Sequence, residues 1–245
     1  MDCQPGHGRL VYKWSNNNQQ CLLCDEHADQ PYPLCSACEA ELPWLDERCL
    51  CCALPLPING MLCGQCTRRA PPFNQVEVPF HYGFPLDSLI SRFKHQARWP
   101  LGRLLGHLLG QWLLARFDDG LPRPDLLLPV PMGRKRLRQR GFNQAAMLAR
   151  WLGPQLGLAV DEHMLLRPHE TLAQQDLDAR QRQRNLLQAF TLVPRARVQG
   201  RHLALVDDVM TTGATARALA QLLLRAGAAR VDVYCLARTP KPGAA

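Results

Sequence analysis

Eight cysteines placed in a twofold repeat constrain the N-terminal part of the chain more than any other feature. They form four Cys-x2-Cys pairs, and each cysteine of the last two pairs lies 28 residues after its counterpart in the first two. Such a turn places two sulfurs close together, and two turns supply the four thiolates of a tetrahedral zinc site. The repeat therefore predicts two structural zinc sites, made of Cys21, Cys24, Cys35 and Cys38 and of Cys49, Cys52, Cys63 and Cys66.

The pairing of the four turns admits two arrangements. A sequential arrangement is favoured because each repeat unit then closes its own short loop at small entropic cost. An interleaved arrangement, which joins the first turn to the third and the second to the fourth, stays open. Disulfides or a redox pair would also use such closely spaced thiols. Ten of the 11 cysteines lie in the first 66 residues, and in a reducing compartment such clustering favours metal.

The start of the chain and its charge distribution bear on location and partners. Residues 1–8 do not have the pattern of a signal peptide, and no run of 18 apolar residues occurs, so we expect a cytoplasmic protein without a membrane span. Ala70–Phe73 contains two prolines and marks a boundary between domains 1–70 and 71–245. The first holds 5 Lys+Arg and 8 Asp+Glu, and the second holds 24 and 13. A basic larger domain suits a polyphosphate ligand and also nucleic acid.

The second domain contains a strand–loop–helix pattern that predicts a ligand-binding site. The apolar run 202–206 predicts a buried strand, Asp207 and Asp208 follow it, and 216–226 predicts a helix. A loop between a strand and the amino end of a helix presents free backbone N–H groups and the positive end of the helix dipole. The small residues that would let a phosphate reach that backbone are Thr211, Thr212, Gly213, Ala214 and Thr215. With the aspartates accepting hydrogen bonds from two sugar hydroxyls, the pattern predicts a ribose 5-phosphate pocket. The alternative is an ordinary turn with an Asp N-cap.

Two further basic segments are candidates for anion binding. A buried strand over 125–131 leads into a loop whose basic residues are Arg134, Lys135, Arg136, Arg138 and Arg140. Its place at the carboxyl end of a strand favours an anion site over a solvated face. Lys94, with Arg92 and Arg98 nearby, ends a helix over 86–95 and would reach a pyrophosphate, unless these cations only complement the helix dipole. The polar segment 169–188 predicts a lid, with a surface helix as the alternative.

Strands and helices alternate through the larger domain. Strands are expected over 75–82, 125–131, 190–193, 203–206 and 231–237, and leucine-rich helices between them, including 101–117. This order predicts an α/β fold: an open, mostly parallel sheet with helices on both faces, preceded by a small zinc-ribbon module. The loops at 131–141 and 207–215 would then meet at one edge of the sheet.

Several of these motifs together resemble known families. The gap-free pattern hydrophobic-Asp-Asp-x-x-Thr-Thr-Gly-x-Thr resembles the signature loop of type I phosphoribosyltransferases, which use 5-phosphoribosyl-1-pyrophosphate (PRPP) as donor. With the cysteine module, Pro-Val-Pro at 129–131, Arg-Gly-Phe-Asn-Gln at 140–144 and the polar residues of 171–185, the chain resembles the ComF family, which includes GntX-type proteins. That family couples a double zinc ribbon to a phosphoribosyltransferase domain and is linked to competence and the use of external DNA. The resemblance covers about residues 21–238.

The resemblance implies roles for the candidate residues. Asp207 and Asp208 would hold the ribose and stabilise positive charge at its anomeric carbon, and Mg²⁺ would be held mostly by the donor and water. The arginines at 134, 136, 138 and 140 would stabilise the departing pyrophosphate. The residues Gln174, Arg182 and Asn185 would belong to the lid. Thr211 stands where purine-salvage relatives often have Asp, which disfavours hypoxanthine or guanine as acceptor and leaves the acceptor open.

A second class of function is a PRPP-sensing or single-stranded-DNA-binding adaptor without catalysis, in contact with DNA or the DNA-uptake machinery. Zinc ribbons recur in nucleic-acid proteins, and Trp44, Trp99 and Phe142 would be available for stacking on bases. As a ligand at a loop mouth, Asp208 is not expected to hold the fold together. The oligomeric state is not indicated by the sequence.

Overall fold

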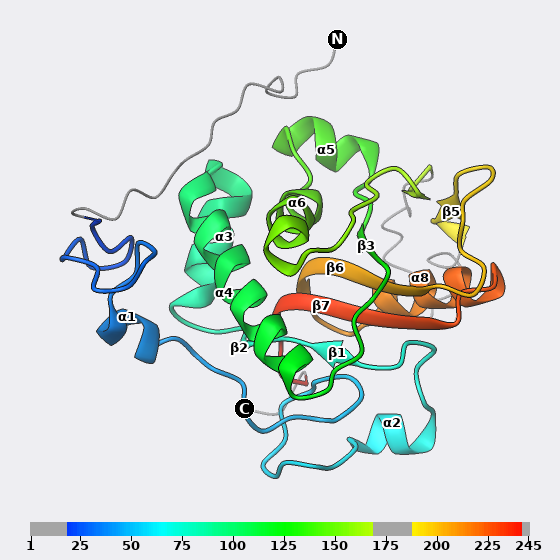
Figure 1. The fold of residues 1–245 in the computed structure, drawn as a ribbon, viewed down its shortest axis with the longest axis horizontal. Helices are drawn as coiled ribbons and strands as arrows, with labels where there is room; N and C mark the ends of the chain where they lie inside the picture. Colours follow the sequence, from blue (N-terminus) through cyan, green and yellow to red (C-terminus); the bar gives the residue numbers. More distant parts are fainter. Residues whose placement is uncertain (1–18, 169–187, 242–245) are drawn as a thin grey trace, which may run out of the picture.

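The computed structural model describes residues 19–168 and 188–241. The expected lid residues Gln174, Arg182 and Asn185 lie outside the described residues. The main sheet is parallel, with the strand order β1–β7–β6–β3 and with β2 also paired to β7 (Figure 1). Its strands are β1 (Val76–Glu77), β2 (Phe80–His81), β3 (Leu126–Pro129), β6 (His202–Met210) and β7 (Arg230–Arg238). The short strands β4 (Leu165–Leu166) and β5 (Thr191–Leu192) form a separate antiparallel pair.

The two central strands carry the sheet. β6 and β7 have nine residues each and pair in parallel, with Leu205 opposite Val233 and Val206 opposite Tyr234. On the other side of β6, Leu128 of β3 is opposite Leu205. These strands are nearly continuous apolar runs, as expected when both faces of a parallel sheet are covered.

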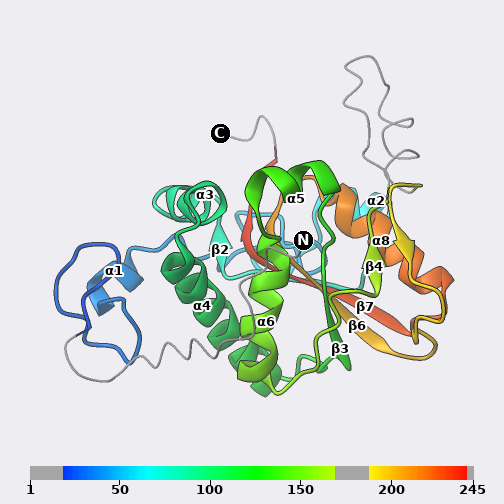
Figure 2. The same ribbon diagram turned by 90° about the horizontal axis from the view of Figure 1, so that it is seen from above.

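Helices cover both faces (Figure 2). On one face lie α3 (Leu86–Gln96), α4 (Trp99–Asp118) and α6 (Gln144–Leu156), whose leucines form one apolar cluster with Tyr234 and Leu236. On the other face lies α8 (Ala214–Arg225), whose Leu219 and Leu223 form a second cluster with Leu205 and Val233. Each cluster buries one side of the sheet, so the predicted open parallel sheet with helices on both faces is confirmed.

The two zinc-ribbon units pack on different parts of this fold. The first contains α1 (Ser36–Ala40) and lies against α4, where the rings of Tyr32 and His107 are 4.8 Å apart. The second contains α2 (Gly64–Arg68), and its cysteines belong to the same apolar cluster as Met210 and Ala216. The second unit therefore shares a core with the larger domain, although the sequence predicts a domain boundary near residue 70.

Several elements differ from the sequence expectation. The strand expected over 75–82 is two short strands separated by Val78 and Pro79, because proline cannot continue the ladder. The strand expected over 190–193 pairs with β4 instead of the main sheet. β6 continues through Asp207 and Asp208 to Met210, so both aspartates lie on the strand and not in the loop.

The basic segment expected as a loop is also a helix, α5 (Arg134–Arg140). Arginine, lysine, leucine and glutamine are all good helix formers, so this run has no internal reason to stay irregular. Gly133 and Gly141 flank it, and Gly141 ends the helix at a left-handed φ of 84°. None of the helices in the described ranges is long and apolar enough to cross a membrane.

Candidate active site and metal centres

A pocket lies where β6 turns into α8. It is lined by Thr211 to Thr215 together with Asp207, Val130, Val233 and Cys235. Gly213 adopts a left-handed φ of 73°, which lets the chain turn into the helix. A Cβ there would lie 2.5 Å from Cε of Met210, so the end of that flexible side chain would also have to shift. The turn therefore depends on glycine at this position.

The loop backbone offers hydrogen-bond donors to an anion. Within the described part of the chain, the N–H groups of Thr211, Thr212, Gly213 and Thr215 donate to no protein acceptor. The N–H of Ala214 donates to the hydroxyl of Thr212 at 3.3 Å. The 12-residue helix α8 begins at Ala214 and adds the positive end of its dipole. Free N–H groups at a helix amino end form an anion-binding site.

The two aspartates have different surroundings. Asp207 lines the pocket, whereas Asp208 is 4% exposed and is not among the lining residues. Oδ2 of Asp208 lies 2.5 Å from Nζ of Lys94, which α3 brings to this edge of the sheet. One oxygen of each carboxylate also accepts a hydrogen bond from the next backbone N–H, at 2.9 Å for Asp207 and 2.7 Å for Asp208. The structure thus joins Lys94 to the acidic pair, a pairing that the sequence did not indicate.

The surroundings of Asp207 shift the pKa of its carboxyl. Burial and the charge of neighbouring Asp208 raise the pKa of the Asp207 carboxyl well above its usual value, and Lys94 offsets only part of this effect. A nearby cation would favour the ionised form of such a carboxyl. The pocket therefore combines free N–H donors with an acidic group that a bound cation or a developing positive charge would ionise.

The arginines of α5 lie at the same edge of the sheet but outside the pocket. β3 leads to Val130, which lines the pocket, and α5 starts four residues later (Figure 2). The side chains of Arg134, Arg136 and Arg138 are exposed, and Nη1 of Arg140 donates to Oε1 of Gln144 at 2.6 Å. None of the four lines the pocket. The structure thus leaves α5 as a basic surface next to the site.

Arg238, at the end of β7, is a site residue that sequence reasoning missed. It is 5% exposed, and its guanidinium donates to the carbonyls of Met210 at 3.1 Å, Thr239 at 2.9 Å and Thr211. Its Nε also donates to the carbonyl of Cys52 at 3.1 Å. A charged residue at the end of an apolar strand is the only sequence signal, and it does not reveal these partners.

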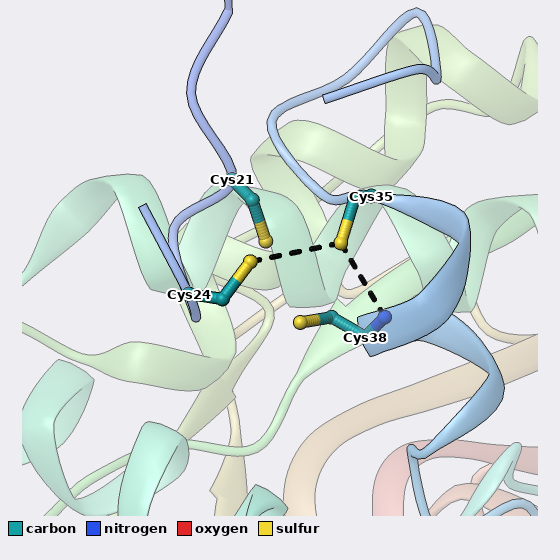
Figure 3. Close-up of side chains that lie close together, drawn as sticks. All are labelled: Cys21, Cys24, Cys35 and Cys38. Atoms are coloured by element: carbon teal, nitrogen blue, oxygen red, sulfur yellow. Dashed lines mark hydrogen bonds between the residues drawn. The ribbon is translucent and has the colours of Figure 1, made fainter. Parts of the chain in front are cut away.

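The cysteines gather in two tetrads. The first consists of Cys21, Cys24, Cys35 and Cys38, and the second of Cys49, Cys52, Cys63 and Cys66; within each, all four sulfurs lie within 4.8 Å of one another. The sequential arrangement is therefore confirmed over the interleaved one. Figure 3 shows the four sulfurs of the first tetrad pointing toward a common centre.

The spacing of the sulfurs fits a metal ion. The sulfurs of Cys24 and Cys35 are 3.7 Å apart, and those of Cys52 and Cys63 are 3.6 Å apart. A tetrahedral zinc ion with Zn–S bonds of about 2.3 Å requires sulfurs about 3.8 Å apart. Four thiolates leave no open coordination position, so the tetrads support two structural zinc sites.

The two tetrads differ in burial. All four cysteines of the second are buried, whereas Cys24 of the first is exposed and Cys35 and Cys38 are partly exposed. Burial raises the pKa of the Cys21 thiol, but three backbone N–H groups outweigh it and lower the pKa to about 7. The pKa of Cys49 is lowered to about 7 by the same balance. Each site therefore stabilises one thiolate through its own backbone.

Comparisons with known proteins agree with this architecture. Residues 18–67 match the double zinc ribbon domain family. The chain is 41% identical over 222 residues to the DNA utilization protein YhgH of Salmonella typhi, which covers 89% of this chain and 96% of that protein. It is 34% identical over 207 residues to competence protein F of Haemophilus influenzae, which covers 84% of this chain and 90% of that protein.

Solved structures with a similar arrangement include the glutamine PRPP amidotransferase of Bacillus subtilis. Its TM-score is 0.38 at 20% identity, over 55% of this chain and 25% of that one. The adenine phosphoribosyltransferase of Leishmania tarentolae has a TM-score of 0.36 at 15% identity, over 54% and 70%. Scores of this size support no argument about function, and the fold assignment rests on the sheet and helices described above. With the sequence relatives, the two cysteine tetrads and the loop after β6, the chain belongs to the ComF family of competence and DNA utilization proteins.

Proposed function

We propose that the chain binds PRPP with Mg²⁺ in the pocket between β6 and α8 and transfers its phosphoribosyl group to an acceptor. The observation that carries the proposal is the set of N–H groups at the amino end of α8, those of Thr211, Thr212, Gly213 and Thr215, that have no partner among the described residues. They suit the 5-phosphate of the donor, because a helix amino end with free donors favours a phosphate.

The acidic residues suit the sugar. Asp207 lines the pocket next to the loop, where its carboxylate would accept hydrogen bonds from the ribose hydroxyls. In the transfer, the bond from the anomeric carbon to pyrophosphate breaks and a bond to the acceptor atom forms, so positive charge develops at that carbon. An ionised Asp207 would stabilise this charge. Mg²⁺ would neutralise part of the charge of the pyrophosphate and would be held mostly by donor oxygens and water.

Cations near the site suit the leaving group. Lys94 is paired with Asp208 and does not line the pocket, but 18% of its side chain is exposed, which would let it approach the pyrophosphate of a bound donor. The arginines of α5 would need to turn toward the pocket to do the same. The proposed division of roles therefore gives Lys94 first contact with the pyrophosphate and leaves α5 for longer-range attraction.

Calorimetric titration with Mg·PRPP tests the donor site. Thr212→Val removes one hydroxyl from the loop and should weaken binding about three- to tenfold, since a neutral hydrogen bond contributes about 0.5–1.5 kcal/mol. Thr191→Val makes the same change at an exposed residue of β5 and should leave affinity unchanged. No binding to the folded protein, or equal affinity of Thr212→Val and the unaltered chain, would refute the donor site.

Catalysis requires a second measurement. Release of pyrophosphate from Mg·PRPP should depend on an acceptor, and a panel of nucleobases and single-stranded DNA would identify the class. Tight donor binding without pyrophosphate release from any of these would favour a PRPP-sensing adaptor over a transferase. The names of the relatives, DNA utilization protein and competence protein, support including DNA in the panel.

A second candidate function is the binding of single-stranded DNA by α5. Arg134, Arg136 and Arg138 are exposed and have no acidic partner among the residues described, which leaves their charges available for phosphates. Two of the aromatic residues expected for stacking are not available. Phe142 is buried beside Phe93 and Trp99, and Trp44 packs on Phe80.

The salt dependence of binding tests this candidate. Each arginine that contacts a phosphate contributes about −0.7 to the slope of log K against log salt for a single strand. Changing Arg134, Arg136 and Arg138 together to alanine should therefore flatten the slope by about 2. An unchanged slope would place the DNA contact elsewhere or show that none exists.

A further inference from the structure

Arg238 connects the second zinc centre to the phosphate-binding loop. Its Nε donates to the carbonyl of Cys52, and its Nη1 donates to the carbonyls of Met210 and Thr211. The first partner belongs to a cysteine of the second tetrad, and the other two belong to the turn after β6. Arg238, Cys52 and Met210 are buried, and among the described residues no carboxylate pairs with the guanidinium. Its charge is therefore balanced by backbone carbonyls alone.

The geometry of the peptide gives this contact a consequence for the loop. In a planar trans peptide, the C=O and the following N–H point in opposite directions. A guanidinium that holds the carbonyls of Met210 and Thr211 therefore turns the N–H groups of Thr211 and Thr212 away from itself. The pocket is lined by these residues but not by Arg238, so the guanidinium lies behind the loop. Arg238 thus fixes the orientation in which two donors face an anion.

The other end of the contact depends on the metal. Cys52 closes a Cys-x2-Cys turn with Cys49, in which the N–H of Cys49 donates to Leu54 and that of Ala53 to Cys49. Ala53 has a left-handed φ of 50°, which is costly for a residue with a side chain. Formation of a zinc site and folding of its turns are one process. We therefore expect the carbonyl of Cys52 to lose its fixed position when the second centre loses its metal.

The two zinc centres are not equivalent in this respect. The second tetrad belongs to the apolar cluster that contains Met210 and Ala216, on either side of the loop. Cys21 of the first tetrad belongs to the cluster on the opposite face of the sheet, and its ribbon contacts α4. No contact joins the first ribbon to the loop in the part of the chain that the structure describes.

We propose that the second zinc centre holds the phosphate-binding loop in its anion-binding conformation through Arg238, and that the first centre has no such role. Arg238 is then a positioning residue, which acts on the ligand through the backbone of Thr211 and Thr212. This inference rests on the proposed function, in which the ligand of the loop is the phosphate donor PRPP. Loss of zinc from the second centre would release the loop and lower affinity for a phosphate donor, which makes donor binding dependent on metal at a distance from the pocket.

The repeat provides matched variants for the test. Cys66→Ser and Cys38→Ser remove the last ligand of the second and the first tetrad, at equivalent positions 28 residues apart. Each should lose about one zinc ion per chain. Cys66→Ser should weaken Mg·PRPP binding at least about tenfold, whereas Cys38→Ser should leave it within about twofold, because only the second centre connects to the loop.

Substitutions of Arg238 keep the test decisive if Cys66→Ser fails to fold. Arg238→Met removes every donor of the guanidinium and should weaken Mg·PRPP binding about ten- to a hundredfold with both zinc ions retained. Arg238→Lys keeps a charge and donors for one side of the connection and should give an intermediate affinity. A merely structural role would lower the melting temperature without this order of affinities at temperatures well below unfolding.

Hydrogen exchange tests the connection without the ligand. The amides of Arg217 and Thr239 donate to the carbonyls of Gly213 and Met210, so their exchange rates report the conformation of the turn. Both should exchange faster in Arg238→Met and in Cys66→Ser, and at the unaltered rate in Cys38→Ser. Unchanged exchange in Arg238→Met, or equal effects of the two cysteine changes, would overturn the inference. Failure of the unaltered chain to bind Mg·PRPP would refute the proposed function. The exchange rates would then test by themselves whether Arg238 and the second zinc centre hold the loop.

Discussion

The ion pair between Lys94 and Asp208 makes a quantitative prediction about stability. Asp208 follows Asp207 directly, and Lys94 is the cation that offsets their repulsion. The exposed fractions of the two side chains are 18% for Lys94 and 6% for Asp208. Removal of one partner from a buried pair leaves an uncompensated charge and costs about 3–5 kcal/mol. Because Lys94 is partly exposed, we expect Lys94→Met to cost about 3 kcal/mol, near the lower end.

A double-mutant cycle measured by urea unfolding of the zinc-saturated protein tests this value. Lys94→Met and Asp208→Asn should each destabilise the fold, and the combined variant should recover part of the loss. The coupling energy should be about 1–3 kcal/mol, as for residues in one ionic network. Lys241→Met removes an exposed lysine and should change stability by less than about 0.5 kcal/mol. Additive effects of the two changes would refute the pair as a stabilising contact.

The same pair changes how the donor site must be assayed. From the sequence, Asp208 is expected to be a ligand at a loop mouth whose loss leaves the fold intact. The structure shows a buried carboxylate paired with Lys94, so Asp208→Asn should cost stability as well as affinity. The affinity for Mg·PRPP must therefore be measured at a temperature where this variant is fully folded.

Three further predictions concern the metal centres, the pocket carboxyl and the turn. Elemental analysis should find two zinc ions per chain, and a chelator should remove the first before the second, because Cys24 is exposed whereas the whole second tetrad is buried. Asp207 has a folded pKa above its unfolded value, so its contribution to stability is full below the unfolded pKa and is lost as pH rises through the folded pKa. Asp207→Asn should therefore raise the melting temperature at pH 7 but not below pH 4, by about 2–4 °C per kcal/mol relieved. Gly213→Ala places a side chain at positive φ and against Met210, and should cost about 1–2 kcal/mol or more in calorimetric unfolding and weaken Mg·PRPP binding.

The features that the sequence predicts well are those with a local signal. The spacing of the cysteines is repeated, so both tetrads and their sequential pairing follow from short loops. The apolar runs of β6 and β7 and the glycine before α8 likewise depend on neighbouring residues alone. The loop donors follow from this local structure, since a turn into a helix leaves its first N–H groups unpaired.

The features that the sequence does not predict join distant segments. Lys94 meets Asp208 only because α3, which packs on α4, brings its last turn to the end of β6, and Arg238 meets Cys52 across a separation of 186 residues. Periodicity and motif spacing carry no information about such pairs. The helix at 134–140 was missed for a different reason, because clustered charge suggested a loop although each residue favours a helix.

The strand order of the sheet also sets the order of events during synthesis. Among the described strands β1 pairs only with β7, where Val76 lies opposite Val233, so it stays unpaired until residues 230–238 have left the ribosome. The zinc ribbons need only local contacts and can form long before that point. The contact from Cys52 to Arg238 is therefore among the last to close. A chain interrupted before β7 would carry both metal sites but no anchored turn after β6, and its apolar strands would be exposed to aggregation.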